Sequence, residues 1–358
     1  MSGPLVSVVM PVHNAAPFLD EALGSIIGQS FSDFEFVIRD DGSTDGSIDI
    51  LRSWALRDSR IRLFEGSRLG PAGSSNWIVN AAAAPFIARM DADDVAFSDR
   101  LRRQVEVLHA SPDVVLLGTM FDTVDRGGRT VRPYDFSRLA KCSYSAPFPH
   151  ASIMFRRDAF ERIGGYRSAC EHWEDLDLYL RMAEQGRIGV LAETLLAYRA
   201  HASTRLTAER DAVEGCLNRR YRCIEAHRQD GNYESLIALP IADDGKCHPR
   251  AFVALGSMEL WAGGAPDVLG RLIRRGDLKW DSATLLAIVW AVWARVSPAS
   301  LRWLLAALVR IRSLAGKRNV EHGRVYEWNP RQARRAGPGG RPAPKHGSVP
   351  PVRRAGFG

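Results

Sequence analysis

The chain has 358 residues, of which 46% are hydrophobic and 25% charged, and its formal net charge is +7. This length allows one large domain with an extension, or two domains, and the apolar content is enough to bury a core. The five cysteines are odd in number and show no C-x-x-C spacing, which favours unpaired thiols in a reducing compartment over a disulfide framework. No basic segment followed by an apolar one precedes Leu5, so we expect no cleaved signal peptide.

Predicted strands and helices alternate over the first part of the chain. Residues 6–12 form a nearly continuous apolar run typical of a central parallel strand, and further strands are expected over residues 34–38 and 61–64. Amphipathic helices are expected after the first two strands, the first with Pro17 in its opening turn, and residues 74–83 form a third helix. This β-α-β-α order predicts an α/β fold with a mainly parallel central sheet. A dinucleotide-binding G-x-G-x-x-G does not follow the first strand.

The next predicted strand, residues 86–88, ends at three carboxylates, Asp91, Asp93 and Asp94. Open α/β sheets bind ligands outside the carboxyl ends of their strands. Carboxylates this close repel one another unless a cation lies among them. Mg²⁺ takes one or two protein carboxylates and completes its coordination with phosphate oxygens and water. The cluster therefore predicts a metal-diphosphate site, with a solvated acidic turn as the alternative for this motif taken alone.

The following elements continue the alternating pattern. Residues 100–110 form a predicted helix with Leu101, Val105 and Leu108 inward, and residues 114–118 form a buried strand before a hairpin turn at Gly127 and Gly128. A buried strand is expected over residues 152–155, and a helix over residues 174–184. Acidic residues at the head of that helix interact favourably with its dipole.

Five blocks of this sequence together resemble the family 2 glycosyltransferases, and they follow the family's order and spacing across about residues 4–205. The blocks are VSVVMPVHN, SIIGQSFSDFEFVIRDDGSTDGS, MDADDVAFSDRL, FPHASIMFRRDAFERIGGY, and HWEDLDLYLRM with LLAYRAH. The resemblance implies a GT-A fold, a Rossmann-like α/β sandwich, over residues 1–205. It also implies a nucleotide-diphosphate sugar donor, a divalent metal (Mg²⁺ or Mn²⁺) and inversion of the anomeric centre.

The same resemblance assigns expected roles to single residues. Asp41 matches the aspartate that contacts the nucleotide base, with backbone from Pro11 and Val12 beside it. Asp91 and Asp93 match the D-x-D pair that holds metal and diphosphate, Asp93 facing the metal, and Asp94 lies beside them. Asp175 matches the catalytic base, which takes the proton of the acceptor hydroxyl.

For several neighbouring residues two interpretations stay open. Glu174 either supports the base or is a first-turn carboxylate, and Trp173 either stacks on the acceptor or belongs to the core. Arg199 and His201 resemble a loop that closes over the diphosphate, an exposed loop histidine being the alternative for His201. His150 precedes a buried strand, where a packed histidine is favoured over an acceptor contact.

One position departs from the family pattern. Many relatives carry a basic residue before Asn76, where this chain has Ser75. Arg68 or the loop around Arg199 is the expected substitute for that basic residue, with weaker phosphate binding as the alternative.

The resemblance ends near Thr207. We predict a helical region over residues 206–325, with apolar helices at 283–296 and 301–311 that are too short to span a bilayer. They either pack on the catalytic domain or lie in a membrane interface. Residues 326–358 are predicted to form a disordered tail, because they are rich in Pro and Gly and carry seven basic and no acidic residues from 331 onward. An anionic membrane or nucleic acid would attract such a tail; a solvated tail without a partner is the alternative, and nucleic acid is the less expected partner.

The leading hypothesis is an inverting, metal-dependent glycosyltransferase that uses a UDP-sugar to build a surface polysaccharide or glycoconjugate. Its acceptor would be a glycan, a lipid-linked glycan or a protein. We expect it in the cytoplasm, with peripheral contact at the inner face of the cell membrane. A sugar nucleotidyltransferase is disfavoured because no basic Gly-rich loop lies near the first strand. A scaffold protein with a decayed site is disfavoured because Asp41, Asp91, Asp93 and Asp175 are all present.

Overall fold

The computed structural model describes residues 3–132, 148–170, 173–200 and 322–329, and the single residues 223, 226 and 234. The chain divides into two units. The first comprises residues 1–168, 174–199 and 313–358 and contains every strand described below. The second comprises residues 169–173 and 200–312. The predicted helices at 283–296 and 301–311, most of the region 206–325, and His201 lie outside the described residues.

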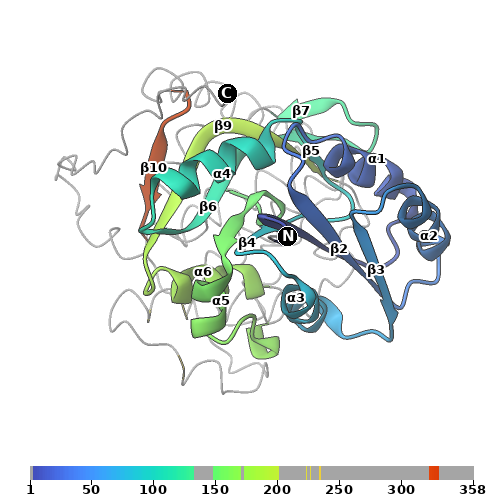
Figure 1. The fold of residues 1–358 in the computed structure, drawn as a ribbon, viewed down its shortest axis with the longest axis horizontal. Coiled ribbons are helices and arrows are strands. Elements are labelled where there is room, and N and C mark those ends of the chain that lie inside the picture. Colours follow the sequence, from blue (N-terminus) through green and yellow to red (C-terminus); the bar gives the residue numbers. More distant parts are fainter. Residues whose placement is uncertain are drawn as a thin grey trace, which may run out of the picture. The chain divides into compact units, whose positions relative to one another are not determined.

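The first unit is built on a ten-stranded sheet with the order β10-β9-β6-β8-β4-β1-β2-β3, as counted over the described residues (Figure 1). Strands β4, β1, β2 and β3 are parallel, and β6 is parallel to β9, whereas β8 lies antiparallel between β4 and β6. The strands on this path are β1 (Val6–Val12), β2 (Phe34–Asp41), β3 (Ile61–Gly66), β4 (Phe86–Arg89), β6 (Val114–Val124), β8 (Met154–Arg156), β9 (Arg187–Arg199) and β10 (Val325–Trp328). Two short strands pair at its margin, β5 (Val95–Ala96) with β9 and β7 (Thr130–Arg132) with β6.

Six helices connect the strands within the described residues. They are α1 (Ala16–Ile27), α2 (Ser47–Arg57), α3 (Gly70–Ala81), α4 (Arg100–Ala110), α5 (Arg157–Arg162) and α6 (Glu174–Met182). The predicted third helix was placed four residues too late, because α3 begins at Gly70 and has proline in its first turn. A proline there costs no hydrogen bond, since the first backbone N–H groups of a helix have no intrahelical partner.

The core forms where the apolar strands meet the apolar stripe of α1. Val8 and Met10 of β1 are fully buried, as are Leu19, Leu23 and Ile26 of α1. A parallel strand covered on both faces reads as a continuous apolar run, which is why β1 and β2 were recognisable in the sequence. The hairpin predicted at Gly127 and Gly128 is confirmed: β6 and β7 pair antiparallel, and Gly128 has a φ of 80°.

Helix α4 is tied to the core by two fully buried polar side chains. Arg100 donates to the carbonyl of Arg89 at 2.6 Å and to Sδ of Met90 at 3.4 Å. Gln104 donates to the carbonyls of Leu117 at 3.0 Å and Ser152 at 2.9 Å. These bonds fix the end of β4 against β6 and the segment before β8. Since β4 leads directly into the acidic cluster, they also fix the site.

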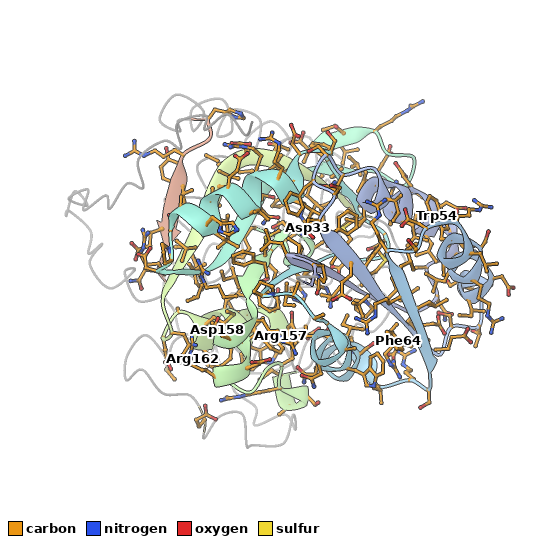
Figure 2. All side chains as sticks on the ribbon, viewed as in Figure 1. Asp33, Trp54, Phe64, Arg157, Asp158 and Arg162 are labelled. Carbon is orange, nitrogen blue, oxygen red and sulfur yellow. The ribbon has the colours of Figure 1, made fainter. Side chains whose placement is uncertain are left out.

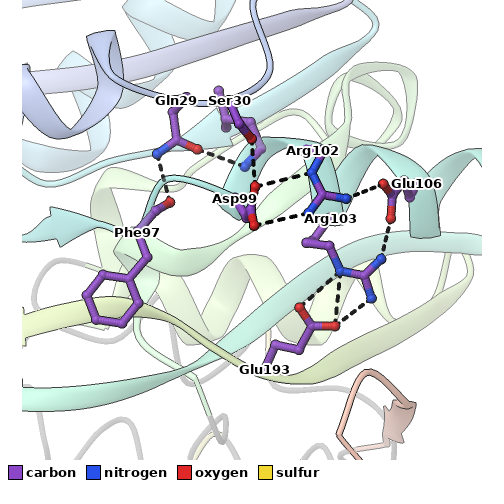
Figure 3. Close-up of polar contacts among 9 residues, drawn as sticks. Gln29, Ser30, Phe97, Asp99, Arg102, Arg103, Glu106 and Glu193 are labelled. Atoms are coloured by element: carbon purple, nitrogen blue, oxygen red, sulfur yellow. Dashed lines mark hydrogen bonds and ion pairs between the residues drawn. The ribbon is translucent and has the colours of Figure 1, made fainter. Parts of the chain in front are cut away.

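Side-chain hydrogen bonds join the residues that follow α1 to the residues at the start of α4 (Figure 3). Gln29 donates to the carbonyl of Phe97 at 2.8 Å and accepts the N–H of Leu101 at 3.0 Å, while Ser30 donates to Asp99 at 2.8 Å. On the outer side of α4, ion pairs link Arg102 and Arg103 to Asp99, Glu106 and Glu193. Glu193 belongs to β9, so this network holds the helix onto the sheet.

Helix α5 follows β8 directly and leads toward α6. Arg157, labelled in Figure 2, donates to the carbonyl of Ala82 after α3, and Asp158 pairs with Arg162 at 2.8 Å along the helix. Two glycines with positive φ, Gly164 at 74° and Gly165 at 73°, then reverse the chain. This turn brings the following residue, Tyr166, back to α3.

Strand β10 corrects one boundary predicted from the sequence. Tyr326, Glu327 and Trp328 were assigned to a disordered tail, but they pair antiparallel with β9 through residues 188–190. Val325 and Trp328 are 7% and 6% exposed. The described residues 322–329 therefore add the last strand to the sheet. No helix among the described residues is long and apolar enough to cross a bilayer.

Candidate active site

The acidic cluster follows β4, whose last residue is a buried arginine. Arg89 donates from Nε and Nη2 to Oδ1 of Asp91 at 3.0 and 2.8 Å, and from Nη1 to the hydroxyl of Ser75 at 2.7 Å. Burial alone would raise the pKa of Asp91, but Arg89 and other nearby cations outweigh it and hold that pKa below its usual value. Asp91 is therefore a carboxylate, and its second oxygen, Oδ2, takes no part in the Arg89 contacts.

Asp94 occupies a different environment from Asp91. It is 1% exposed, its Oδ1 accepts the backbone N–H of Arg199 at 2.8 Å, and its Oδ2 has no hydrogen-bond partner among the described residues. Burial, followed by the charges of Asp93 and Asp91, raises the pKa of Asp94 well above its usual value. Of these two carboxylates, only Asp91 is held in its charged form by a cation.

Arg199, at the end of β9, holds the acidic loop from the other side. Its side chain is 1% exposed and donates to the carbonyl of Asp93 at 2.8 Å, to the carbonyl of Arg126 at 2.8 Å and to Glu21 at 2.5 Å. These protein acceptors occupy all three guanidinium nitrogens, and this differs from the diphosphate contact expected from the sequence. Arg199 instead holds the loop in place through its hydrogen bonds to Asp93 and Asp94.

Helix α6 presents the predicted base and lies in the same unit as the acidic loop. Glu174 and Asp175 are half-buried in its first turn, and Asp175 Oδ1 accepts the N–H of Leu176 at 2.7 Å. Asp177 and Arg181, four residues apart on the helix, form an ion pair, with Arg181 Nε 3.0 Å from Asp177 Oδ2. That pair is buried, so it anchors the helix while Asp175 stays partly accessible.

Asp175 and the acidic cluster act on the same tyrosine hydroxyl groups, so they lie near one another. The Tyr198 hydroxyl is desolvated and lies in the fields of Asp94, Asp93, Asp91 and Asp175, all of which raise its pKa. Desolvation and the charges of Asp91, Glu174 and Asp175 likewise raise the pKa of Tyr166, and the charge of Arg89 lowers it. The structure thus gathers Asp91, Asp93, Asp94, Glu174 and Asp175 around one site.

A hydrogen-bonded pair of rings, His150 and Tyr166, lies within this site. Nε2 of His150 is 2.7 Å from the hydroxyl of Tyr166. Desolvation, followed by the charge of Arg89, lowers the pKa of His150 to about 4, so the ring is neutral at pH 7. The backbone of Tyr166 is fixed by Asn76 of α3, whose side chain accepts its N–H at 2.8 Å and donates to its carbonyl at 2.9 Å.

Asp41 ends β2 in a second polar cluster. Its carboxylate accepts the backbone N–H groups of Leu69 at 2.8 Å and Gly70 at 3.0 Å, and it pairs with Arg39. Pro11 and Val12 lie opposite Arg39 and Asp40 in the parallel register, so all the residues predicted for the nucleotide base are adjacent. Three protein donors already bind the Asp41 carboxylate, which leaves limited acceptor capacity for a ligand.

A histidine and an arginine extend this second cluster. His13 Nδ1 lies 3.1 Å from the carbonyl of Asp41, which fixes Nδ1 as the donor, and Arg68 donates to Nε2. Arg68 is exposed, and it was one of the two expected substitutes for a basic residue at position 75. The residue that does contact Ser75 is Arg89.

The sequence interpretation missed Arg89 and Tyr166 as residues of this cluster. Arg89 had a detectable signal, because it interrupts an apolar strand two residues before Asp91, and side chains two apart on an extended segment share a face. Trp173 was left between two interpretations; it is 1% exposed, as a core residue would be. His201 lies outside the described residues.

Comparisons with known proteins identify relatives of this chain. The model described as glycosyl transferase family 2 matches residues 7–164. EpsE of Bacillus subtilis, described as a glycosyltransferase, is 36% identical over 194 residues, which cover 52% of this chain and 69% of EpsE. The O-antigen biosynthesis glycosyltransferase WbnJ of Escherichia coli is 29% identical over 205 residues, which cover 55% of this chain and 80% of WbnJ.

The same fold occurs in a solved structure of a mannosyltransferase. PcManGT from Pyrobaculum calidifontis, in complex with GDP-Man and Mn²⁺, superposes with a TM-score of 0.51 and 23% identity over 88% of each chain.

Proposed function

The chain belongs to glycosyl transferase family 2, and we propose that it transfers a sugar from a nucleotide-diphosphate sugar to an acceptor hydroxyl with inversion of the anomeric centre. The observation that carries the proposal is the convergence of Asp175 with Asp91 and Asp93 in one electrostatic environment. Inverting transfer needs both a group that takes the acceptor proton and a centre that accepts negative charge on the leaving diphosphate.

The acidic loop has a donor set that fits a divalent metal. Asp91 keeps Oδ2 outside its ion pair, and Asp93 follows two residues later on the same loop. Within the described residues no group of three or more His, Cys, Asp or Glu side chains is arranged to hold a metal ion by itself. A shared site, in which diphosphate oxygens and water complete the coordination, is the arrangement that Mg²⁺ prefers. When bound, Mg²⁺ or Mn²⁺ supplies Lewis-acid stabilisation of the leaving diphosphate.

The protein's own groups account for the other steps. Asp175 takes the proton of the acceptor hydroxyl as that oxygen bonds to the anomeric carbon, and the bond to the diphosphate breaks. Arg89 keeps Asp91 ionised beside the leaving group. Arg199 and the Asp94 carboxyl hold the loop in place through β9.

The donor and its pathway are further parts of the proposal. Asp41, Pro11 and Val12 form the nucleotide end, and we propose a UDP-sugar as the first donor to test. The name of WbnJ places that relative in O-antigen biosynthesis, which supports a surface polysaccharide or glycoconjugate as the product. A cytoplasmic location, with peripheral contact at the inner membrane face, completes the proposal.

Calorimetric titration of the full chain with UDP, GDP and dTDP tests the donor site. Each nucleotide is added with Mn²⁺ or Mg²⁺ and again with EDTA. We expect metal-dependent binding of one nucleotide, with loss of at least tenfold in affinity in Asp93→Asn. The matched control Asp158→Asn, on the exposed side of α5, keeps wild-type affinity. Absence of binding by all three nucleotides in a folded sample contradicts the proposal.

A second variant separates the base from donor binding. Asp175→Asn is isosteric and removes the proton-accepting charge, so we expect nucleotide affinity within about twofold of wild type and sugar transfer reduced by about 10²–10⁴-fold. Transfer is measured as nucleoside diphosphate released in the presence of acceptor. Wild-type transfer in Asp175→Asn excludes this residue as the base, and release of pyrophosphate identifies a nucleotidyltransferase.

A further inference from the structure

Tyr179 of α6 carries a hydroxyl that the protein leaves without a partner. The side chain is 0% exposed, and its hydroxyl makes no hydrogen bond in the part of the chain that the structure describes. A buried hydroxyl without a partner destabilises the fold, because its lost hydrogen bonds to water are not replaced. A phenylalanine would fill the same space without that cost. The hydroxyl therefore gains its partner in a state that includes a ligand or a bound water.

The ring of Tyr179 is held by three aromatic side chains from two other segments, the stretch before β8 and strand β10. The centroid of Phe148 lies 5.2 Å away, that of His150 6.3 Å, and that of Trp328 on β10 6.4 Å. These contacts leave the ring little freedom, so the direction of the hydroxyl is fixed by the fold. Tyr179 lies four residues after Asp175, on the same face of α6. Long side chains on a helix lean toward its N-terminus, so the hydroxyl is directed toward the turn that bears Asp175.

Charges around the hydroxyl identify its surroundings as the active site. Desolvation, then the charges of Asp175, Tyr166 and Asp91, raise the pKa of Tyr179 well above its usual value. The phenol stays protonated at neutral pH and is available as a donor. His150 and Tyr166 already satisfy each other at 2.7 Å, so Tyr179 is the neighbouring ring with a free hydrogen-bonding group.

We infer that the Tyr179 hydroxyl hydrogen-bonds the nucleophilic oxygen beside Asp175 and orients it toward the anomeric carbon. The inference rests on the proposed function. The ligand chemistry is a neutral O–H group, which comes from an acceptor sugar or, without one, from water. Tyr179 donates to one lone pair of that oxygen and keeps its own proton. The oxygen gives its proton to Asp175 as its other lone pair bonds to the anomeric carbon and the diphosphate departs with the electrons of the broken bond.

Tyr179→Phe is the test, because it removes one oxygen and keeps the ring contacts. The full chain is loaded with sugar esters of the nucleoside diphosphate that the titration identifies. One arm measures donor hydrolysis, in which water is the nucleophile, and the other measures transfer to methyl glucoside, methyl galactoside and methyl mannoside. We expect kcat/KM to fall about three- to tenfold in at least one arm. Nucleotide affinity stays within twofold, and the melting temperature is equal to or above that of wild type.

The matched control is Tyr326→Phe, the same chemical change on β10, where the ring packs against Arg324. It keeps wild-type rates in both arms. A fall in the hydrolysis arm shows that the held oxygen is the nucleophile whatever its source, and a fall confined to the glycosides assigns the contact to an acceptor sugar.

Three results overturn the inference. In the first, Tyr179→Phe has unchanged rates in both arms. In the second, the variant loses nucleotide affinity or melts several degrees lower, which makes the hydroxyl structural. In the third, wild type binds nucleotide but supports neither reaction. Failure of the proposed function looks different, because wild type then binds none of the nucleotides.

Discussion

Two buried arginines, Arg89 and Arg199, determine how the acidic loop is presented. Arg89 pairs with Asp91 and reaches Ser75, whereas Arg199 bonds the Asp93 carbonyl and, through its backbone, the Asp94 carboxyl. A buried arginine is stable only when its donors are satisfied. Each satisfies part of its donors with the loop and the rest with other elements, Arg89 with Ser75 and Arg199 with Arg126 and Glu21. The loop is therefore tied to these elements through the two arginines.

The neutral state of His150 makes stability depend on pH in a defined direction. Its pKa is 6.5 in an unfolded chain and about 4 in the fold, because of desolvation and the Arg89 charge. Between these values the unfolded chain binds more protons, so stability is complete above pH 6.5 and falls as the pH falls toward 4. We expect a loss of about 2 kcal/mol from this residue between pH 7.5 and pH 5.

Chemical denaturation of wild type and His150→Gln at both pH values measures this effect. Glutamine does not titrate, and it keeps a donor and an acceptor for the Tyr166 hydroxyl. The free energy of unfolding of the variant therefore falls less on acidification than that of wild type. Parallel losses in the two proteins would show that His150 does not titrate differently in the folded state.

The positions of the acidic residues relative to the strands and helices were easier to predict from the sequence than the contacts of the buried arginines. Asp91, Asp93, Asp94 and Asp175 follow strand and helix boundaries that apolar periodicity marks locally. The partners of an arginine depend on long-range packing: Arg199 contacts a loop 105 residues earlier in the chain. Because such long-range contacts cannot be read from the sequence, Arg199 was expected to contact the diphosphate. In the structure its hydrogen bonds go to the acidic loop and to other parts of the protein.

At the scale of elements, the turn between α5 and α6 positions Tyr166. Gly164 and Gly165 have almost the same positive φ, 74° and 73°. A Cβ added at Gly164 meets nothing within 4 Å, whereas one at Gly165 would lie 2.6 Å from Asn76 Oδ1 and 3.0 Å from Phe160. Replacing Gly164 would therefore introduce backbone strain alone, whereas replacing Gly165 would add a steric clash with its neighbours.

We expect Gly164→Ala to cost about 1 kcal/mol, the strain of a non-glycine residue at positive φ. Gly165→Ala adds a steric clash and costs about 3 kcal/mol. It also reduces sugar transfer, because Asn76 can no longer hold the Tyr166 backbone. Urea denaturation and transfer assays on both variants check this. Equal losses in the two variants would mean that Asn76 moves away without consequence.

The regular elements were predictable to different degrees for physical reasons. Strands β1, β2 and β4 were found from their apolar residues, although β2 extends to Asp41 and so includes the acidic residue at its end. The start of α3 was missed because Gly70 and its proline resemble a loop signal. Strand β8 was expected from residue 152, but His150–Ser152 form a 3₁₀ turn and the strand begins at Met154.

At the scale of the whole molecule, strand β10 returns to the sheet after a long interval in the sequence. It pairs with β9, and its last residue, Trp328, packs edge-on against Phe148 and Tyr179. Four residues in a charged, glycine-containing stretch give too short a pattern to be recognised as a strand. The catalytic unit nevertheless depends on them, because they cover β9 and hold the ring that lies behind Asp175.

This dependence predicts that a change at the end of the chain reaches the active site. Trp328→Ala removes a large side chain that is 6% exposed, so we expect a loss of about 3 kcal/mol in the free energy of unfolding. The neighbouring Glu327→Ala, on an exposed position of the same strand, should change stability by less than about 0.5 kcal/mol.

Under conditions where both variants remain folded, only Trp328→Ala should lower sugar transfer, since only that change frees the Tyr179 ring. Urea denaturation and steady-state transfer assays give the two quantities. A Trp328→Ala protein with wild-type stability and transfer would show that β10 is an appended strand and that the site is complete without it.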